Sequence, residues 1–331
     1  MLEFHAAATD HTILVAGQGL TPAEFVHRAA DHLDGRSSTE DDPALRQAVQ
    51  KFLDAGLSAL VPSHTPQWVE YRLHQPDGIN PRLYAALAAL ARELLTGAAE
   101  DFFFMHKSPG LRVRFRLPDR PERPDALSAV ESHLTHWQHE GLIHGWSHAV
   151  YEPEAHIFGG PTSMESVHRI FTADSLAWAD FWSTDALRRP VWALSLLMIE
   201  GLFDSLRIVG WEDRDVWDRL RRQGQRSFPG EKPDGWPDLR KKIQHLWSEP
   251  GRLHTTVESW GSPYAGAFRS AVQQEAPVWF DRYFTTAEAY VGPREAAAFL
   301  IVYHWNRARL PFTWQCAITE ALAGDTTSKD R

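Results

Sequence analysis

The sequence contains one cysteine, Cys316, in 331 residues. A single cysteine excludes an internal disulfide and is typical of a reducing compartment. No segment approaches the roughly 20 consecutive apolar residues that cross a bilayer. The first residues carry Glu3 and Asp10 rather than the basic start of a signal peptide. We therefore expect a cytoplasmic protein that has no membrane partner.

Several short motifs of well-known enzyme classes are also missing. There is no HExxH, GxSxG or CxxC motif and no P-loop. Gly159-Gly160 lacks the glycine and lysine of a phosphate-binding loop, so it predicts a turn. The histidines His133, His136 and His139 share a helix face only in part, and no carboxylate triad accompanies them. A solvated helix face is the better interpretation, and no metal site is expected.

The charge balance is acidic, with 43 Asp and Glu against 34 Lys and Arg, a formal net charge of −9. Such a balance argues against sequence-independent binding of nucleic acid. Hydrophobic residues at 43% and charged residues at 23% are typical of a globular protein. The count of 14 tryptophans is high, and it suits a protein that offers stacking surfaces to an aromatic ligand.

Hydrophobic periodicity divides the chain into three parts. Residues 1–66 predict a helical preface, in which Thr21-Pro22-Ala23-Glu24 begins a helix that runs to about Leu33. A polar loop follows at Gly35–Asp42, and Pro43 begins a second helix.

Residues 67–161 alternate between strand and helix patterns. The predicted order is a strand at Trp68–Leu73, a helix at Asn80–Leu95, a hairpin at Phe102–Arg116, a helix at Asp125–Glu140, a strand at Trp146–Tyr151 and a loop at Glu152–Pro161. This order predicts a ferredoxin-like antiparallel sheet with its helices on one face.

Residues 162–324 predict a large helical bundle. Its helices are expected at Thr162–Ala179, with a capping box from Thr162 to Glu165, and at Pro190–Val209, Asp213–Arg226, Trp236–Trp247, Tyr264–Glu275, Val278–Tyr290 and Pro293–Arg307. The fold class is therefore α+β, and residues 1–331 are expected to form a single enzyme domain.

The strand after the Ser108-Pro109-Gly110 turn has an unusual polar face. Apolar residues alternate with Arg112, Arg114 and Arg116, and three arginines along one strand repel one another unless an acceptor lies against them. A solvated outer face would explain them. An arginine-lined cleft for a peptide or a carboxylate is the alternative to this more usual arrangement, because guanidinium presents a rigid fork of donors.

A second unusual stretch is Tyr303-His304-Trp305-Asn306-Arg307, at the end of an apolar helix. A histidine there can be a satisfied core residue. His, Asn and Arg together favour a helix end that faces a polar cavity.

These stretches resemble the elimination domain of class I lanthipeptide dehydratases. The hairpin FFFMHKSPGLRVRFR is similar to that family's FFIRYWDPGPHLRLRF, and YEPEAHIFGGPTSMESVHRIFTADS is similar to YEPETERYGGPEAMEAAHRLFHADS. The Tyr303–Arg307 stretch resembles the terminal HMHxNR element. Order and spacing agree from about Trp68 to Arg307. The family includes stand-alone elimination subunits and pyridine synthases of thiopeptide biosynthesis, which perform a formal [4+2] aza-cycloaddition.

The resemblance implies a set of site residues. Arg112 and Arg114 match the family's hairpin arginines and His304 its histidine, whereas Ile157 stands where the elimination enzymes have a third arginine and His156 stands at the acid before it. The lost arginine favours the cyclase, as do the tryptophans, because a cyclase substrate is rich in flat thiazoles. The implied catalytic residues are His304, Arg112, Arg114 and Tyr303, and the implied substrate-binding residues are Arg307, Asn306, Trp305, Arg116 and His156.

The resemblance also implies roles and partners. Arg112 and Arg114 would orient amide carbonyls, His304 would shuttle protons, and Trp305 would stack on an azole. The expected partner is a precursor peptide, with leader and modified core, together with other enzymes of its pathway; no cofactor is required. Two alternatives stay open, a split elimination subunit that removes glutamate from glutamylated Ser/Thr and a non-catalytic precursor-binding protein.

Overall fold

The computed structural model describes residues 13–15, 18–33, 45, 48–49, 52, 67–75, 78–108, 110–118, 120–184, 189–249 and 251–324. The chain divides into two compact units, residues 1–65 and 66–331, which are considered separately. The loop predicted at Gly35–Asp42, the prolines 62 and 66 and the tail 325–331 lie outside the described residues.

The first unit begins with a short hairpin that the sequence does not predict. Strand β1 (Ile13–Val15) pairs antiparallel with β2 (Gln18–Leu20), and helix α1 (Pro22–Leu33) follows. The predicted start of α1 is confirmed, because Thr21 N–H donates to Glu24 Oε2 at 2.8 Å and Glu24 N–H donates to Thr21 Oγ1 at 3.3 Å. These reciprocal bonds form a capping box.

A small core supports the first unit. Phe25 and Ala29 of α1 are buried together with Leu45 and Val49. Leu45, Val49 and Phe52 are helical, in agreement with the second predicted helix, whose other residues lie outside the described part of the chain.

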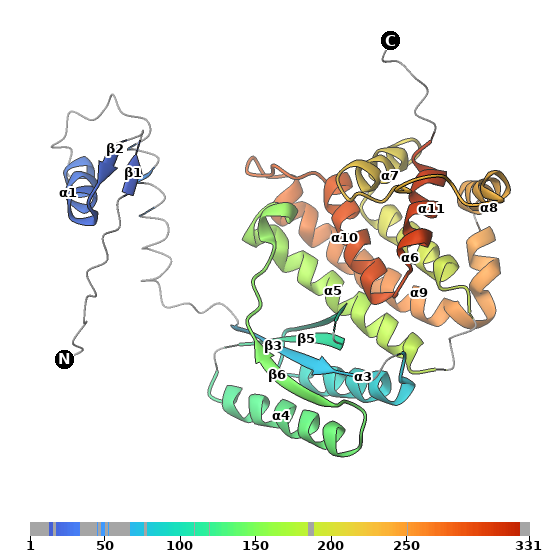
Figure 1. Ribbon diagram of the computed structural model, residues 1–331, viewed down its shortest axis with the longest axis horizontal. Helices are drawn as coiled ribbons and strands as arrows, with labels where there is room; N and C mark the ends of the chain where they lie inside the picture. Colours follow the sequence, from blue (N-terminus) through green and yellow to red (C-terminus); the bar gives the residue numbers. More distant parts are fainter. Residues whose placement is uncertain are drawn as a thin grey trace, which may run out of the picture. The chain divides into compact units, whose positions relative to one another are not determined.

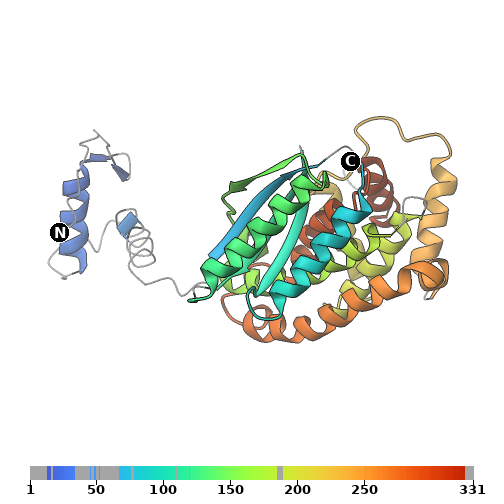
Figure 2. The same ribbon diagram turned by 90° about the horizontal axis from the view of Figure 1, so that it is seen from below.

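The second unit contains the predicted sheet and its two helices. The elements are β3 (Gln67–His74), α3 (Pro81–Leu95), β4 (Asp101–Lys107), β5 (Gly110–Leu117), α4 (Arg123–His139) and β6 (Gly145–Ala149). The four strands are antiparallel in the order β4-β5-β3-β6, the ferredoxin-like order that the sequence predicts. Helices α3 and α4 lie on one face of the sheet and the bundle lies on the other side (Figures 1 and 2).

Strict alternation explains why the sheet has two different faces. Leu111, Val113 and Phe115 of β5 are buried toward α3 and α4, as are the neighbouring Phe102 and Phe104 of β4. Arg112, Arg114 and Arg116 point the opposite way because side chains alternate along a strand. The start of α3 is fixed as predicted by Asn80, whose Oδ1 accepts a hydrogen bond from the Arg82 N–H at 3.1 Å.

The outer edge of β4 is closed by side chains of the bundle. The backbone N–H of Phe102 donates to Thr172 Oγ1 at 3.0 Å, and that of Phe104 donates to Ser175 Oγ at 3.2 Å. Both hydroxyls belong to the first helix of the bundle, which satisfies part of the unpaired strand edge.

The bundle follows a short 3₁₀ helix, η2 (Ala155–Phe158). Its helices are α5 (Pro161–Trp182), α6 (Val191–Ser205), α7 (Glu212–Arg222), α8 (Trp236–Ser248), α9 (Arg252–Trp279) with a π-helical extension η3 (Phe280–Phe284), α10 (Pro293–Arg307) and α11 (Phe312–Leu322). Helix α10 has the predicted bounds, α7 ends four residues before the predicted Arg226, and α11 is not predicted.

The two helices predicted at Tyr264–Glu275 and Val278–Tyr290 are wrong as separate elements. Residues 252–279 form one helix that contains Pro263 and Pro277. The prolines suggested breaks, yet buried side chains recur every three or four residues from Leu253 to Ala276. Continuous packing of this stripe on α5 and α6 outweighs the local cost of the prolines.

The capping box predicted for α5 is also wrong. The N-cap is Gly160 and Pro161 is the first helical residue, so Thr162 already lies inside the helix, and Glu165 forms an ion pair with Arg282 at 3.0 Å. The predicted Gly-Gly turn is confirmed. Gly159 has φ of +99°, and a Cβ there would lie 2.0 Å from the Tyr283 hydroxyl, so only glycine fits.

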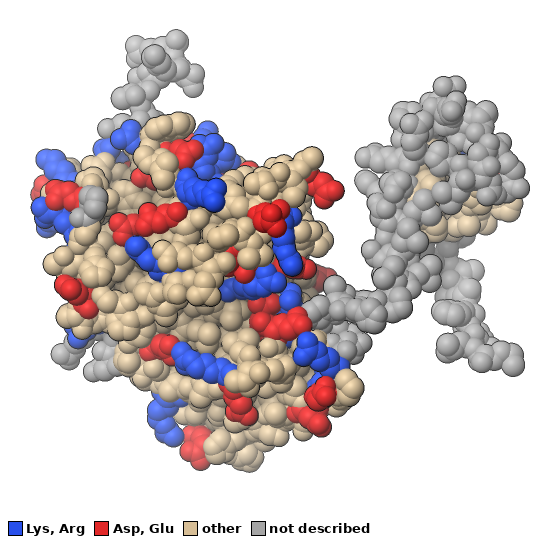
Figure 3. Space-filling model, turned by 180° about the vertical axis from the view of Figure 1, so that it is seen from behind, with Lys and Arg blue, Asp and Glu red and all other residues tan. Residues whose placement is uncertain are grey.

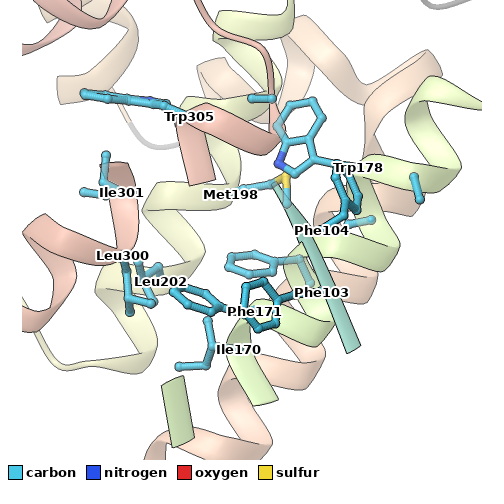
Figure 4. Packing of buried hydrophobic residues seen from close by; sticks show 14 of the residues in the cluster. Phe103, Phe104, Ile170, Phe171, Trp178, Met198, Leu202, Leu300, Ile301 and Trp305 are labelled. Carbon is cyan, nitrogen blue, oxygen red and sulfur yellow. The ribbon is translucent and has the colours of Figure 1, made fainter. Parts of the chain in front are cut away.

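Aromatic and aliphatic side chains join the sheet to the bundle. Phe103 of β4 lies beside Phe171 of α5, with Leu202 of α6 and Leu300 of α10 next to them (Figure 4). Seven of the 14 tryptophans are buried, and Trp211 is the one that is exposed. Most of the tryptophan surplus therefore builds the core instead of a stacking surface. Acidic and basic side chains are interspersed on the face seen in Figure 3.

Candidate functional site

The arginine strand faces a buried carboxylate on the neighbouring strand. Glu70 of β3 lies opposite Arg114 in the register and is 1% exposed. Its Oε2 lies 2.6 Å from Arg114 Nε, and its Oε1 lies 3.6 Å from Arg112 Nη1 and 3.8 Å from Arg72 Nε. One acid therefore partly offsets the repulsion among Arg72, Arg112 and Arg114, and the strand is neither a simple solvated face nor an uncompensated cationic floor.

Arg112 and Arg114 differ in exposure. The Arg114 guanidinium lies over the rings of Phe103 at 4.9 Å and Tyr151 at 4.6 Å, and burial raises the pKa of the Tyr151 phenol. The Arg112 side chain stays 22% exposed. Arg112 is thus the arginine of this pair that a solute can reach.

Arg116 belongs to a separate ion-pair group at the far end of the strand. It lies 2.8 Å from Glu100 and 3.0 Å from Asp101. Burial raises the pKa of Asp101 to about 6, although Arg116 acts in the opposite direction. The structure does not place Arg116 with the Glu70 cluster.

His304 lies inside the bundle, 5% exposed. Its Nδ1 is 2.7 Å from Asp174 Oδ1, and its Nε2 is 3.0 Å from Ser195 Oγ. Trp305 Nε1–H donates to the same Ser195 oxygen at 3.2 Å. Trp178 Nε1 lies 3.3 Å from the same Nδ1, so both ring nitrogens are engaged by protein groups.

This connectivity is that of a Ser-His-Asp triad, but Ser195 is fully buried and has no access to a substrate. We therefore interpret these side chains, which we call the Asp174 cluster (Asp174, Ser195, His304 and Arg307), as a structural network.

Arg307 completes the Asp174 cluster. It is fully buried, its Nη1 donates to Asp174 Oδ2 at 2.8 Å, and its guanidinium lies 4.2 Å from the centre of the Phe171 ring. Burial lowers the pKa of Arg307 to about 10 against the pull of Asp174. Burial alone would raise the pKa of Asp174, but His304 and Arg307 outweigh it and hold that pKa below its usual value.

An enclosed cavity of about 10 Å³ lies beside Asp174, His304 and Arg307. This volume is roughly that of one water molecule. Arg307 Nε and Nη2 have no protein partner, so the cavity has donors to offer a water but no space for a peptide.

An open hollow of about 400 Å³ lies where β4, α10 and the start of α11 meet. Its lining includes Met105, Tyr303, Asn306, Arg226 and Arg309. Among the described residues, the Tyr303 hydroxyl has no hydrogen-bond partner. Its ring is held 4.9 Å from Phe171.

Arg112 does not itself line this hollow, but its cross-strand neighbour Met105 does. Met105 lies directly opposite Arg112 in the β4–β5 register, and directly opposed residues project from the same face. The hollow and the Glu70 cluster (Glu70, Arg72, Arg112 and Arg114) therefore form the best candidate site in the described part of the chain.

Asn306 fastens α10 to the edge of β4. His106 N–H donates to Asn306 Oδ1 at 2.7 Å, and Asn306 Nδ2 donates to the His106 carbonyl at 2.9 Å. The His106 ring bridges the Asn306 carbonyl and the Tyr84 hydroxyl, each at 2.8 Å. Burial lowers the pKa of His106 to about 4, so this ring is neutral. Asn306 lines the hollow, but its amide is already used.

Of the remaining predicted site residues, Trp305 is among those that line the hollow, whereas His156 is not. The Trp305 ring is fully buried against Trp217 and offers no face to an azole in this structure. His156 and Ile157 lie on η2, where the side chain of His156 is exposed and its carbonyl accepts a hydrogen bond from Tyr290 at 3.4 Å.

Sequence reasoning missed several residues of these clusters. Glu70 was the acid inside a predicted strand, and the strand pairing was the signal that would have placed it opposite Arg114. Asp174 and Ser195 carried no local signal, because their partners are more than 100 positions away. Arg226 and Arg309 were not noticed as neighbours for the same reason.

No group of three or more His, Cys, Asp or Glu side chains among the described residues is placed to hold a metal ion. His136 and His139 of α4 are exposed, as a solvated helix face requires. No helix within the described ranges is long and apolar enough to span a bilayer.

Comparison with known proteins matches most of the second unit to one family. The profile of the C-terminal domain of lantibiotic biosynthesis dehydratases matches residues 68–314. The crystal structure of the tRNA-dependent lantibiotic dehydratase MibB from Microbispora sp. 107891 is similar with a TM-score of 0.53 and 17% identity, over 79% of this chain and 28% of MibB. TsrL is similar with a TM-score of 0.45 and 15% identity, over 77% of this chain and 93% of TsrL. No curated protein matches significantly.

Proposed function

Because this chain belongs to the lantibiotic biosynthesis dehydratase C-terminal family, we propose that it modifies a ribosomally made precursor peptide as a pyridine synthase. The substrate would carry two dehydroalanines and several azoles. Its cyclisation would join two distant residues of the peptide into a macrocycle. The chain spans 28% of the length of MibB, so the activity of that whole protein is not carried over.

The proposed reaction needs no oxidant. The first dehydroalanine and the amide before it, as the imidic acid, supply four ring atoms, Cβ, Cα, N and the amide carbon. The second dehydroalanine supplies Cα and Cβ. Two carbon–carbon bonds close the six-membered ring, loss of water then forms the ring imine, and elimination of the leader peptide as a carboxamide gives the aromatic pyridine.

The observation that carries this proposal over glutamate elimination is Glu70. Arg112 and Arg114 are already paired with a buried carboxylate of the protein. A second carboxylate, such as a glutamyl leaving group, would have to bind against the charge of Glu70. A neutral amide needs only donors, which the exposed Arg112 can supply. Ile157 at the position of the family's third arginine acts in the same direction.

The structure suggests a division of roles. Arg112 would donate to the amide carbonyl that becomes the imidic acid, and Arg114 would hold Glu70 in place. Tyr303, whose hydroxyl is free of protein partners, would give or take a proton in the hollow. The predicted role of His304 as a proton shuttle stays a prediction, because both of its ring nitrogens are engaged inside the bundle.

Positioning would supply much of the rate enhancement. Intramolecular reactions between well-oriented groups gain about 7–11 kcal/mol from proximity. Binding both dehydroalanines next to Arg112 and Tyr303 would therefore be the main task of the protein.

Incubation of the protein with a precursor that carries dehydroalanines and thiazoles tests the proposal. Mass spectrometry should detect a macrocycle and the leader carboxamide, whose masses together with one water equal the mass of the precursor. Loss of glutamate from a glutamylated precursor, with no ring formed, would instead identify an elimination subunit. Measurable binding with no change of mass would identify a precursor-binding protein.

A further inference from the structure

The hollow beside α10 is cationic in a chain whose net charge is −9. Its lining contains two arginines and no carboxylate: Met105, His106, Arg226, Val302, Tyr303, Trp305, Asn306, Arg309, Leu310 and Gln315. The volume of about 400 Å³ lies within the range of small-ligand sites.

Both arginines have neutral partners only. Arg226 Nε donates to Gln315 Oε1 at 2.8 Å, and its Nη1 donates to the Gly224 carbonyl. Arg309 Nη1 donates to the Gly78 carbonyl at 2.8 Å. Neither forms an ion pair with a described carboxylate, unlike Arg112, Arg114 and Arg116. Burial lowers the pKa of Arg226, and the Cys316 thiol acts in the opposite direction.

The backbone of Arg309 is in the left-handed conformation, which favours glycine. Helix α10 ends at Arg307 with Ala308 as its C-cap, and Arg309 follows with φ of 48°. Glycine is usual at this left-handed position, because a Cβ is strained there. The arginine is thus held where glycine would be easier to accommodate.

We propose that the hollow binds a carboxylate of the peptide substrate, with Arg226 and Arg309 donating to its oxygens beside Tyr303. Guanidinium and carboxylate form paired, charge-assisted hydrogen bonds. The inference rests on the proposed function in one respect, that the ligand is a peptide. It adds a binding site for one end or side chain of the substrate, which the cyclisation reaction does not itself require.

Three synthetic probes separate the two sources of a peptide carboxylate. The first is an acetylated Gly-Ser-thiazole-Ser-thiazole segment with a free C-terminal carboxylate. The second is the same segment with a C-terminal amide, and the third is that amide with one glutamate added at its N-terminal end. Isothermal titration calorimetry with the full chain gives the Kd of each probe.

The test variants are Arg309→Gly and Arg226→Gln. Arg309→Gly removes the guanidinium and at the same time places the favoured residue in the left-handed position, so its melting temperature should be unchanged or raised. Arg82→Gln is the matched control, because Arg82 lies on α3 with its side chain 73% exposed.

We expect a carboxylate probe to bind at least tenfold more tightly than the amide, and we expect each test variant, but not Arg82→Gln, to abolish the difference. A preference for the free acid identifies the C-terminal carboxylate, and a preference for the glutamate probe identifies an acidic side chain. Equal affinity of all three probes, no binding of any, or an unchanged preference in both variants would overturn the proposal. Carboxylate preference without ring formation in the mass-spectrometric assay would leave this site standing and remove only the cyclase.

Discussion

Two polar clusters of this protein use the same chemistry for different ends. In the Glu70 cluster and in the Asp174 cluster, one buried acid holds two or more cationic or hydrogen-bonding side chains. The Glu70 cluster contains Arg112, whose cross-strand neighbour Met105 lines an open hollow, whereas the Asp174 cluster has room for about one water. Acid–arginine pairing therefore does not mark a reactive site unless one partner reaches solvent.

The Asp174 cluster should carry the larger share of stability. Asp174→Asn leaves the buried Arg307 without a counter-charge, and the loss of one partner of a buried pair costs about 3–5 kcal/mol. Urea unfolding should show a free energy of unfolding reduced by this amount. A loss below 1 kcal/mol would contradict the assignment of this cluster as a structural network.

The Glu70 cluster should carry the larger share of turnover. Arg112→Ala removes the exposed donor at the hollow, and loss of such a donor costs about 10²–10³-fold in kcat. Ring formation by mass spectrometry measures the effect, with the melting temperature as a check on folding. Arg72→Ala, which removes the more distant arginine of the same acid, should retain most of the activity. Equal losses in both variants would contradict the role of Arg112.

Stability should fall as the pH falls below about 6.5. Burial lowers the pKa of His106 to about 4 and that of His168 to about 3, whereas the unfolded chain binds these protons near pH 6.5. Unfolding therefore takes up protons, and each histidine removes about 2 kcal/mol between pH 6.5 and 5. The raised pKa of Asp101, about 6, acts oppositely and cancels part of the loss.

His106→Asn checks the share of one histidine. The variant should be less stable at pH 7, but its free energy of unfolding should decline less steeply toward pH 5. A slope that matches the unsubstituted protein would show that His106 is not held neutral in the fold.

The smallest effect concerns the charge of Glu70. Glu70→Gln keeps hydrogen bonding to Arg114 but releases the positive charge of the arginines. Binding of a glutamylated serine peptide should strengthen about tenfold, or 1.4 kcal/mol, by calorimetry. Unchanged affinity would remove the physical reason for preferring cyclisation to elimination.

Much of the fold could be read from local patterns. The alternation in residues 111–116, the cap at Asn80 and the bounds of α10 are confirmed, because turn, cap and alternation are properties of neighbouring residues. Helix α9 shows the limit. Two separate helices were predicted there, whereas packing of one continuous stripe on two other helices holds residues 252–279 in a single helix.

Only part of the candidate site could be predicted from the sequence. The sequence singled out Arg112, Arg114 and His304, but it could not show that Glu70 lies against the first two or that His304 is enclosed. Trp305 was predicted to stack on an azole, but its side chain lies on the side of α10 that is buried in the core.

Chain order and residue type thus suffice for the α+β class, the strand of arginines and the resemblance to the dehydratase family. Which arginine is neutralised, buried or open depends on contacts between residues far apart in the chain. Glu70 and Arg114 are 44 positions apart, and Asp174 and His304 are 130 apart. The charge environment and solvent exposure of a side chain depend on its neighbours in three dimensions. Residues that share an acid or a cavity can be far apart in the chain, so no local sequence pattern identifies them.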